Sequence, residues 1–121
     1  MSDEFDIQQA ADTLKNWTRA YYREAALKRE KAREEAKMLA RRLLESDPTL
    51  KTVWGFGSVF EESRPFRPDS DIDLAIEGGD IFAAFRLVEG SEFKVDVVDI
   101  TDCHDEFAER IRAQGVVLGQ R

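Results

Sequence analysis

The sequence predicts a protein of the α/β or α+β class. Two observations support this prediction: residues 6–45 contain neither glycine nor proline, and three short β-type runs separated by loops and helical segments follow Pro48. The length of 121 residues fits one domain, and 42% hydrophobic residues suffice for one modest core. The expected order is helix, strand, loop, strand, helix, strand, helix.

The N-terminal segment is predicted to be helical. Residues 6–45 are dominated by Ala, Leu, Lys, Arg and Glu, and their apolar residues recur at steps of three, four and seven, which marks one helical stripe. One helix of this length would extend roughly 60 Å, which exceeds the diameter of a small domain. We therefore expect either two helices or one long arm packed on a partner. The Ser46–Pro48 sequence, SDP, is expected to end the helix.

The remainder of the chain has a β-rich pattern. Short strands are expected over 51–56, 71–76 and 93–100, because these runs are rich in β-branched and apolar residues or alternate polar with apolar ones. Residues 57–70, which contain two prolines, are expected to form a loop. Short helices are expected over 81–88 and 105–113, each closed by a glycine.

Composition excludes several classes of protein. The 18 basic and 25 acidic residues give a net charge of -7, which argues against a nucleic-acid-binding module. The N-terminus is acidic and has no apolar segment of a signal peptide, and no run approaches the length needed to span a bilayer. A single cysteine excludes an internal disulfide. These features predict a cytoplasmic protein without a membrane segment.

Three aspartates lie on β-type runs. Asp71 and Asp73 are two residues apart, so a strand would place both on one face, and Asp96 is flanked by valines in a later run. Strands normally avoid aspartate, and Mg²⁺ prefers carboxylate oxygens. If the two strands are neighbours, the three carboxylates converge and can hold two metal ions for phosphoryl transfer. The alternative is a sheet edge kept soluble by charge.

Gly57 and Ser58 directly follow the first predicted strand. Glycine allows a phosphate to approach the backbone closely, and the serine hydroxyl adds a donor. Together, WGFGS at 54–58, PDSDIDLAI at 68–76 and VDVVD at 95–99 resemble the minimal nucleotidyltransferases of the DNA polymerase beta superfamily. The resemblance covers about residues 36–118. It implies the nucleotidyltransferase fold, a small mixed sheet flanked by helices, here with a long N-terminal helical extension over 1–35 before a domain over 36–121.

The resemblance also implies the roles of particular residues. Asp71, Asp73 and Asp96 would be the catalytic carboxylates and would bind two Mg²⁺ ions, with Asp96 acting as or assisting the base. Gly57 and Ser58 would contact the triphosphate of ATP, the expected substrate.

The loop before the second strand holds further candidates for nucleotide binding. These are Ser70, Arg64 and Arg67, since arginine guanidinium groups pair well with phosphates. Twelve residues separate Ser58 from Asp71, where the common form of the family has about ten. The short helix that follows Gly-Ser in the family is therefore not expected with the same geometry.

The expected reaction is transfer of a nucleotidyl group, AMP from ATP, to an acceptor hydroxyl. Small proteins of this family are commonly paired with HEPN toxins, so the resemblance implies an antitoxin that modifies a tyrosine of a toxin. Two alternatives stay open: a non-catalytic module that neutralises its partner by binding, and a transferase for small molecules, as in aminoglycoside nucleotidyltransferases. Direct binding of nucleic acid is not expected.

Residues 5–27 lie outside the part that resembles the family and carry several large apolar side chains. Trp17, Tyr21 and Tyr22 are expected either in an interface or in the core. A helix with a charged middle and an apolar far end needs a cover for that end. The sequence therefore predicts that this arm packs against a second copy or against a partner chain.

Overall fold

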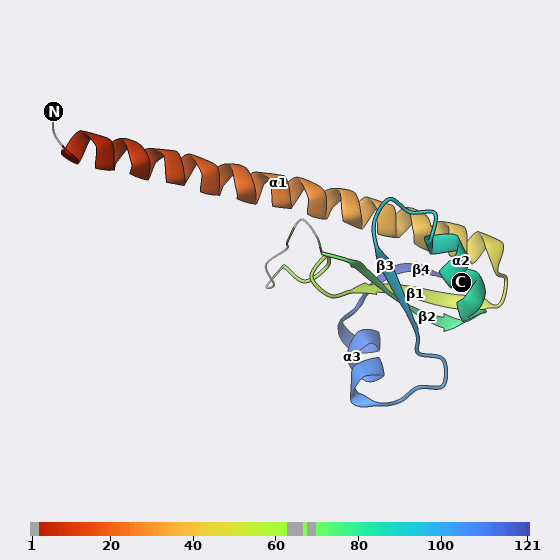
Figure 1. Ribbon diagram of the computed structural model, residues 1–121. Helices are drawn as coiled ribbons and strands as arrows, with labels where there is room; N and C mark the ends of the chain where they lie inside the picture. Colours follow the sequence, from red (N-terminus) through yellow and green to blue (C-terminus); the bar gives the residue numbers. More distant parts are fainter. Residues whose placement is uncertain (1–2, 63–66, 68–69) are drawn as a thin grey trace.

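The computed structural model describes residues 3–62, 67 and 70–121 (Figure 1). Within these residues the chain forms three helices and four strands. In chain order they are α1 (Asp3–Ser46), β1 (Leu50–Phe56), β2 (Ile72–Gly78), α2 (Ile81–Val88), β3 (Val95–Asp99), α3 (Glu106–Gln114) and β4 (Val116–Gln120). The predicted mixed α and β class is confirmed, and the three predicted strands and two predicted short helices all form.

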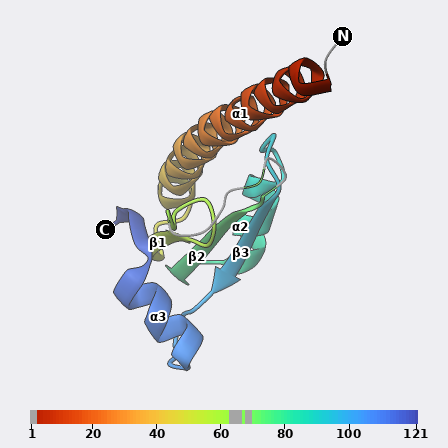
Figure 2. The same ribbon diagram turned by 90° about the vertical axis from the view of Figure 1, so that its left-hand side faces the viewer.

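The strands build one mixed sheet in the order β3-β2-β1-β4. β1 pairs antiparallel with both β2 and β4, whereas β2 and β3 are parallel. Helices α1 and α2 lie on one face of the sheet and α3 lies on the other (Figures 1 and 2). The sequence pattern does not predict β4, because this five-residue edge strand leaves Val116 and Val117 exposed and shows no alternation of buried and exposed positions.

Helix α1 is one continuous helix of 44 residues, so the alternative of two helices is wrong. The absence of glycine and proline from its interior explains why it does not break. Its C-terminal part packs on the sheet through a stripe of small and branched side chains, whose alanines let the helix approach closely. The buried members of this stripe are Ala25, Ala32, Ala36, Leu39, Ala40 and Leu43.

A second cluster fills the space between the sheet and α3. It contains Trp54 of β1, Ala75 of β2, and Ala108 and Ile111 of α3. Trp54 is 6% exposed, so its large ring is part of the core on this face. Because α3 packs on this cluster, one face of the helix lies over the C-terminal end of β1.

The junction after α1 is held by one carboxylate. Asp47 Oδ1 accepts hydrogen bonds from the hydroxyl and the backbone N–H of Thr49 at 2.6 and 3.0 Å, and its Oδ2 accepts from the backbone N–H of Asp80 at 2.8 Å. Arg121 donates from Nη2 to the carbonyl of Asp47 at 3.0 Å and from Nε to the carbonyl of Leu50 at 2.8 Å. These contacts bring the end of α1, the start of α2 and the C-terminal residue together.

The Asp47 junction predicts a pH-dependent stability. The hydrogen bond from the Thr49 hydroxyl, followed by those from the Asp80 and Thr49 N–H groups, lowers the pKa of Asp47 below its usual 3.8. A carboxyl whose pKa is lowered by folding contributes stability above its unfolded pKa, and this contribution is lost as the pH falls through the folded-state pKa. Asp47→Ala should therefore lower the free energy of unfolding at neutral pH. The difference from the unmodified protein should shrink below pH 3.8, as measured by urea unfolding.

The exposed Glu45 on the last turn of α1 offers the control for this measurement. Glu45→Ala should leave the unfolding midpoint near that of the unmodified protein at neutral pH. If the loss in free energy of unfolding caused by Asp47→Ala stayed constant across the acid range, the charge of the carboxylate would not contribute to stability.

In the described part of the chain, no helix is both long enough and apolar enough to cross a membrane.

Candidate functional site

The turn after β1 requires a residue without a side chain. Gly57 has a φ of +78°, a conformation that residues with a Cβ rarely adopt. A Cβ at this position would also overlap Oδ2 of Asp73, which lies against the glycine. The carbonyl of Gly57 accepts hydrogen bonds from the N–H groups of Phe60 and Glu61, both at 3.0 Å. The chain therefore turns tightly here and places the carboxylate of Asp73 directly beside the buried Gly57 backbone.

Two arginines of α1 hold this turn from the other side. Arg29 donates from Nη2 to the carbonyl of Ser58 at 2.8 Å and to that of Glu61 at 3.3 Å. Arg33 donates from Nε to the carbonyl of Val59 at 2.8 Å. Val59 itself is fully buried, so the turn is fixed both by core packing and by these charged donors. The long helix thus positions the segment that the sequence analysis assigns to phosphate binding.

Removing one of these donors should loosen the turn. Arg29→Met keeps most of the aliphatic stem but leaves the Ser58 and Glu61 carbonyls without this donor, so we expect a loss of about 1.5–3 kcal/mol in the free energy of unfolding. Lys31→Met, at an exposed position of the same helix, is the control and should change little. Urea unfolding of both variants measures the difference, and equal stabilities would show that the Arg29 contacts do not stabilise the turn.

Strands β2 and β3 bring two of the predicted aspartates side by side. Asp73 and Asp96 are register partners in the parallel pairing, so both side chains lie on the face of the sheet that carries α3. Asp71 lies just before β2 and two residues before Asp73, so its place on the same face stays a prediction. Asp99, three residues after Asp96, lies on the opposite face, where its Oδ1 accepts from the N–H of Thr101 at 2.9 Å.

A lysine from the start of β3 contacts the first of these carboxylates. Lys94 Nζ lies 3.5 Å from Asp71 Oδ2, and the two side chains are 75% and 32% exposed. An exposed pair of this kind contributes little to stability. The lysine can therefore move away without a large penalty if Asp71 takes another ligand.

The carboxylates fit a hard divalent cation by their chemistry. Asp71, Asp73 and Asp96 offer only oxygen donors from one face of the sheet, the ligand type that Mg²⁺ prefers. In residues 3–62, 67 and 70–121, no three His, Cys, Asp or Glu side chains are already gathered closely enough to hold a metal ion. A complete ligand set would therefore need side-chain rotation and oxygens from a bound phosphate or water. The two-metal site stays a prediction.

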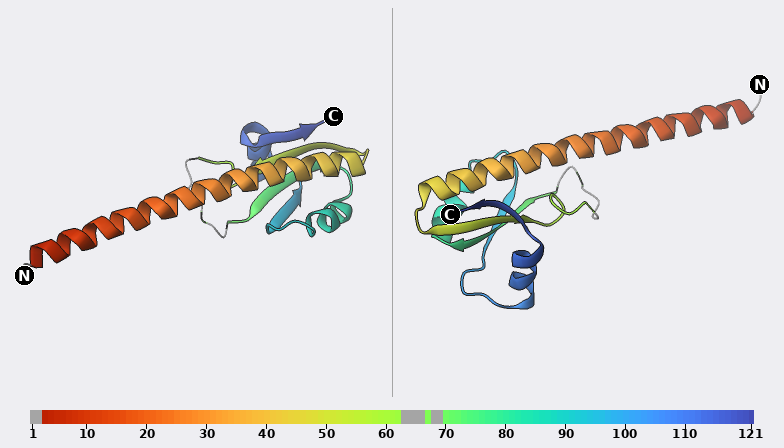
Figure 3. Two further views of the ribbon diagram at one scale, coloured as in Figure 1. Left: turned by 90° about the horizontal axis from the view of Figure 1, so that it is seen from above. Right: turned by 180° about the vertical axis from the view of Figure 1, so that it is seen from behind.

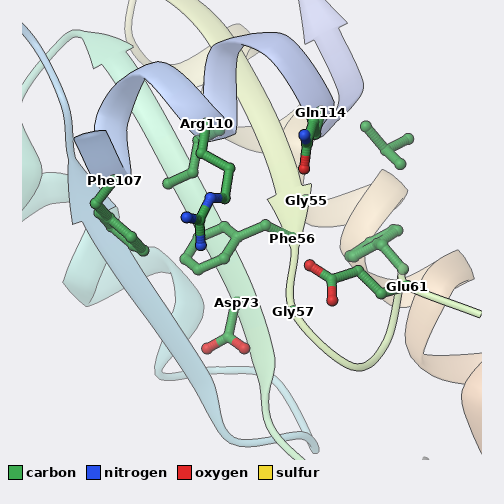
Figure 4. Close-up of a pocket in the computed structure, with 12 residues that line it drawn as sticks. Gly55, Phe56, Gly57, Glu61, Asp73, Phe107, Arg110 and Gln114 are labelled. Carbon is green, nitrogen blue, oxygen red and sulfur yellow. The ribbon is translucent and has the colours of Figure 1, made fainter. Parts of the chain in front are cut away.

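A pocket of about 210 Å³ opens beside Asp73, between the end of β1 and α3 (Figure 4). The rings of Phe56 and Phe107 meet edge to face in its wall, with centroids 5.7 Å apart. Arg110 contributes a cation from the same helix. The volume of the pocket is smaller than that of a site that encloses a whole drug-sized ligand, so it would hold only part of a nucleotide. The lining side chains and glycines are Gly55, Phe56, Gly57, Phe60, Glu61, Asp73, Phe107, Arg110, Ile111, Gln114, Gly115 and Val116.

Of the other predicted nucleotide-binding residues, Ser58, Arg67 and Ser70 lie within the described part of the chain and do not line this pocket. Ser58 is half-buried. The Ser70 hydroxyl accepts from the N–H of Arg67 at 3.1 Å, and the Ser70 N–H donates to the Arg67 carbonyl at 2.9 Å, so both residues form a local turn before Asp71. The Arg67 side chain is exposed, and Arg64 lies outside the described residues.

The sequence pattern does not reveal the pocket wall that α3 provides. Phe107, Arg110 and Gln114 lie on one face of this helix, at steps of three and four. This spacing is the signal that could have singled them out as a shared surface. The order of the residues alone does not show that this face lies over the end of β1.

Comparisons with known proteins agree with the fold. No protein-family model matches the sequence, and no curated protein is significantly similar to it. Among solved structures, the crystal structure of a toxin–antitoxin with AMP-PNP matches with a TM-score of 0.53 and 23% identity, over 70% of this chain and 73% of that chain.

Two further crystal structures give weaker matches. A mutant of the MntA–HepT toxin–antitoxin has a TM-score of 0.49 and 22% identity, over 74% of this chain and 73% of that one. The MntA–HepT toxin–antitoxin itself has a TM-score of 0.47 and 21% identity, over 76% and 73%. The match to the complex with AMP-PNP and the observed topology confirm the predicted fold: the chain has the nucleotidyltransferase fold, a small mixed sheet flanked by helices, with a long N-terminal helical extension.

Proposed function

We propose that this chain transfers AMP from ATP to a hydroxyl of a partner protein and acts as the antitoxin of a HEPN-type toxin. The observation that carries the proposal is the pairing of Asp73 and Asp96 on neighbouring strands, directly beside the Gly57 turn. The match to a toxin–antitoxin structure with AMP-PNP, an analogue of ATP, supports both the nucleotide and the kind of partner.

Each residue of the candidate site would have its own role in binding ATP and Mg²⁺. The glycine at 57 lets the phosphates approach the backbone, and the carboxylates of Asp71, Asp73 and Asp96 would hold Mg²⁺ on the same face. When bound, Mg²⁺ neutralises charge on the triphosphate and makes the acceptor hydroxyl more acidic. Arg110 places a positive charge in the pocket wall, where it can pair with a phosphate.

The proposed reaction is an in-line displacement. The acceptor oxygen attacks the α-phosphorus of ATP, the bond from this phosphorus to the bridging oxygen breaks, and pyrophosphate leaves on the opposite side. The proton of the acceptor hydroxyl passes to the carboxylate of Asp96, which is exposed on β3. The products are an AMP ester of the acceptor and pyrophosphate.

A labelling experiment tests the proposal. The protein is incubated with Mg²⁺, a HEPN-type toxin and ATP labelled at the α-phosphate, and the label is expected on the toxin. ATP labelled at the γ-phosphate is the matched control and should leave the partner unlabelled, because that phosphate departs in pyrophosphate.

The possible outcomes separate the three functions considered. Label from the γ-phosphate on the partner would contradict nucleotidyl transfer. Neutralisation of the toxin with no label from either position would identify a non-catalytic binding module. Transfer to an aminoglycoside or a similar small alcohol in the absence of the partner would identify a small-molecule transferase.

A further inference from the structure

The first half of α1 has no cover within the described chain. Between residues 7 and 24 every side chain is exposed except that of Ala11, which is half-buried. This segment, which we call the arm, projects beyond the sheet and the other helices as a single rod (Figure 3). Ile7, Leu14, Trp17 and Tyr21 are 68, 63, 72 and 48% exposed. Large apolar side chains at this density on one helix indicate a surface that another chain covers.

The apolar stripe of the arm continues the stripe that packs on the sheet. Ile7, Leu14 and Tyr21 are spaced by seven residues, and Ala25 follows one turn later, where burial in the core begins. Trp17 stands three residues after Leu14, so the arm repeats apolar residues with a period of 3.5 over two heptads. Such a period favours packing against another helix rather than against a flat surface.

Charge along the arm is divided between its two ends. Residues 3–14 contain four acidic residues and no basic one, whereas residues 15–24 contain three basic residues and one acidic. Two identical arms side by side in the same direction would place like charges together. Two arms running in opposite directions would place the acidic half of each beside the basic half of the other.

We infer that the arm binds the arm of a second copy of this chain as an antiparallel helix pair. The free length supports this pairing: residues 3–24 extend about 33 Å, so a partner arm centred near Leu14 ends close to the start of the domain of the first chain. A two-fold axis through the middle of the arms relates the two copies, which is the commonest symmetry of homodimers. The inference does not depend on the transfer reaction.

Two variants of the full-length chain test the dimer. The unmodified protein is expected to show twice its 13.9 kDa mass by light scattering at micromolar concentration. Leu14→Asp places charges at the centre of the stripe and should give a monomer. Leu27→Asp is the matched control: Leu27 is 60% exposed, against 63% for Leu14, but lies about a third of a turn off the stripe, so this variant should stay dimeric.

Neither residue belongs to the core, so circular dichroism should show a folded domain in both variants. An unmodified protein that is monomeric throughout this range, or a Leu14→Asp variant that remains dimeric, would overturn the inference. A protein that is monomeric alone and buries the arm only when a toxin is added would overturn it as well.

The direction of the two arms needs a separate measurement. Spin labels are attached to a cysteine introduced at Gln8, Lys15 or Arg23, in a Cys103→Ser background. An antiparallel pair gives a short distance between the two labels at Lys15 and longer ones at Gln8 and Arg23, growing by about 3 Å for each residue from the centre. A distance that is the same at all three positions would show parallel arms and refute the antiparallel pairing.

Discussion

Replacing Asp71 and Asp73 together with asparagine is expected to reduce the rate of nucleotidyl transfer by roughly a thousandfold or more, the scale on which losing a stabiliser of transition-state charge acts. The amides cannot supply the negative oxygens that hold Mg²⁺. The fold should survive, because the contact that Asp71 makes with Lys94 is solvent-exposed and contributes little to stability. Removing two of three like charges from one face should leave the melting temperature unchanged or raise it. Transfer of labelled AMP and a thermal melt measure the two effects.

Asp99→Asn is the matched control for this double variant. It makes the same chemical change on the same sheet, but on the opposite face, and an asparagine side chain can still accept the hydrogen bond from Thr101. Its transfer rate should stay close to that of the unmodified protein. Full activity of the double variant would exclude Asp71 and Asp73 from the site.

Gly57→Val is expected to raise the dissociation constant of Mg-ATP by roughly a hundredfold, the cost typical of a misplaced binding group. A valine strains a backbone with a φ of +78°, and its side chain overlaps the carboxylate of Asp73. The variant should also lose about 1–3 kcal/mol of stability through this strain. Calorimetric titration with Mg-ATP at a temperature where the variant is fully folded separates binding from stability.

Gly90→Ala provides the comparison for Gly57. Gly90 follows α2, is exposed, and a Cβ there would meet only the carbonyl of Leu87 at 3.7 Å. Both ATP affinity and stability should therefore be retained. If Gly57→Val bound Mg-ATP as tightly as Gly90→Ala, the turn would have only a structural role.

The sequence predicted the parts of the structure that depend on short-range patterns. The alternation along a strand placed Asp73 and Asp96 on one face, and the three-residue step from Asp96 placed Asp99 on the other. Asp71 precedes β2, so its assignment to the face of Asp73 stays a prediction. Gly57 was singled out because it directly follows a strand, where a glycine lets a phosphate approach the backbone closely. The positive φ and the carboxylate against the glycine supply the physical reason for it.

Other features depend on contacts between segments that are distant in the sequence, so no local pattern predicts them. Arg29 lies 29 residues before its acceptor Ser58, and the contact exists only because α1 remains one helix. Similarly, Phe107 and Arg110 reach the pocket because α3 is anchored on Trp54. β4 was missed because this five-residue edge strand contains a glycine and shows no alternation of buried and exposed positions.

The continuity of α1 also determines how the chain opens locally. In an unpaired chain, the part of α1 over residues 7–24 opens first, because none of its side chains is buried and able to resist unwinding. Resistance begins at Ala25 and increases at Arg29, where further unwinding would release the carbonyls of Ser58 and Glu61. Proteolysis can therefore trim the arm without effect on the Gly57 turn, whereas a cut only one or two helical turns further along α1 would set that turn free.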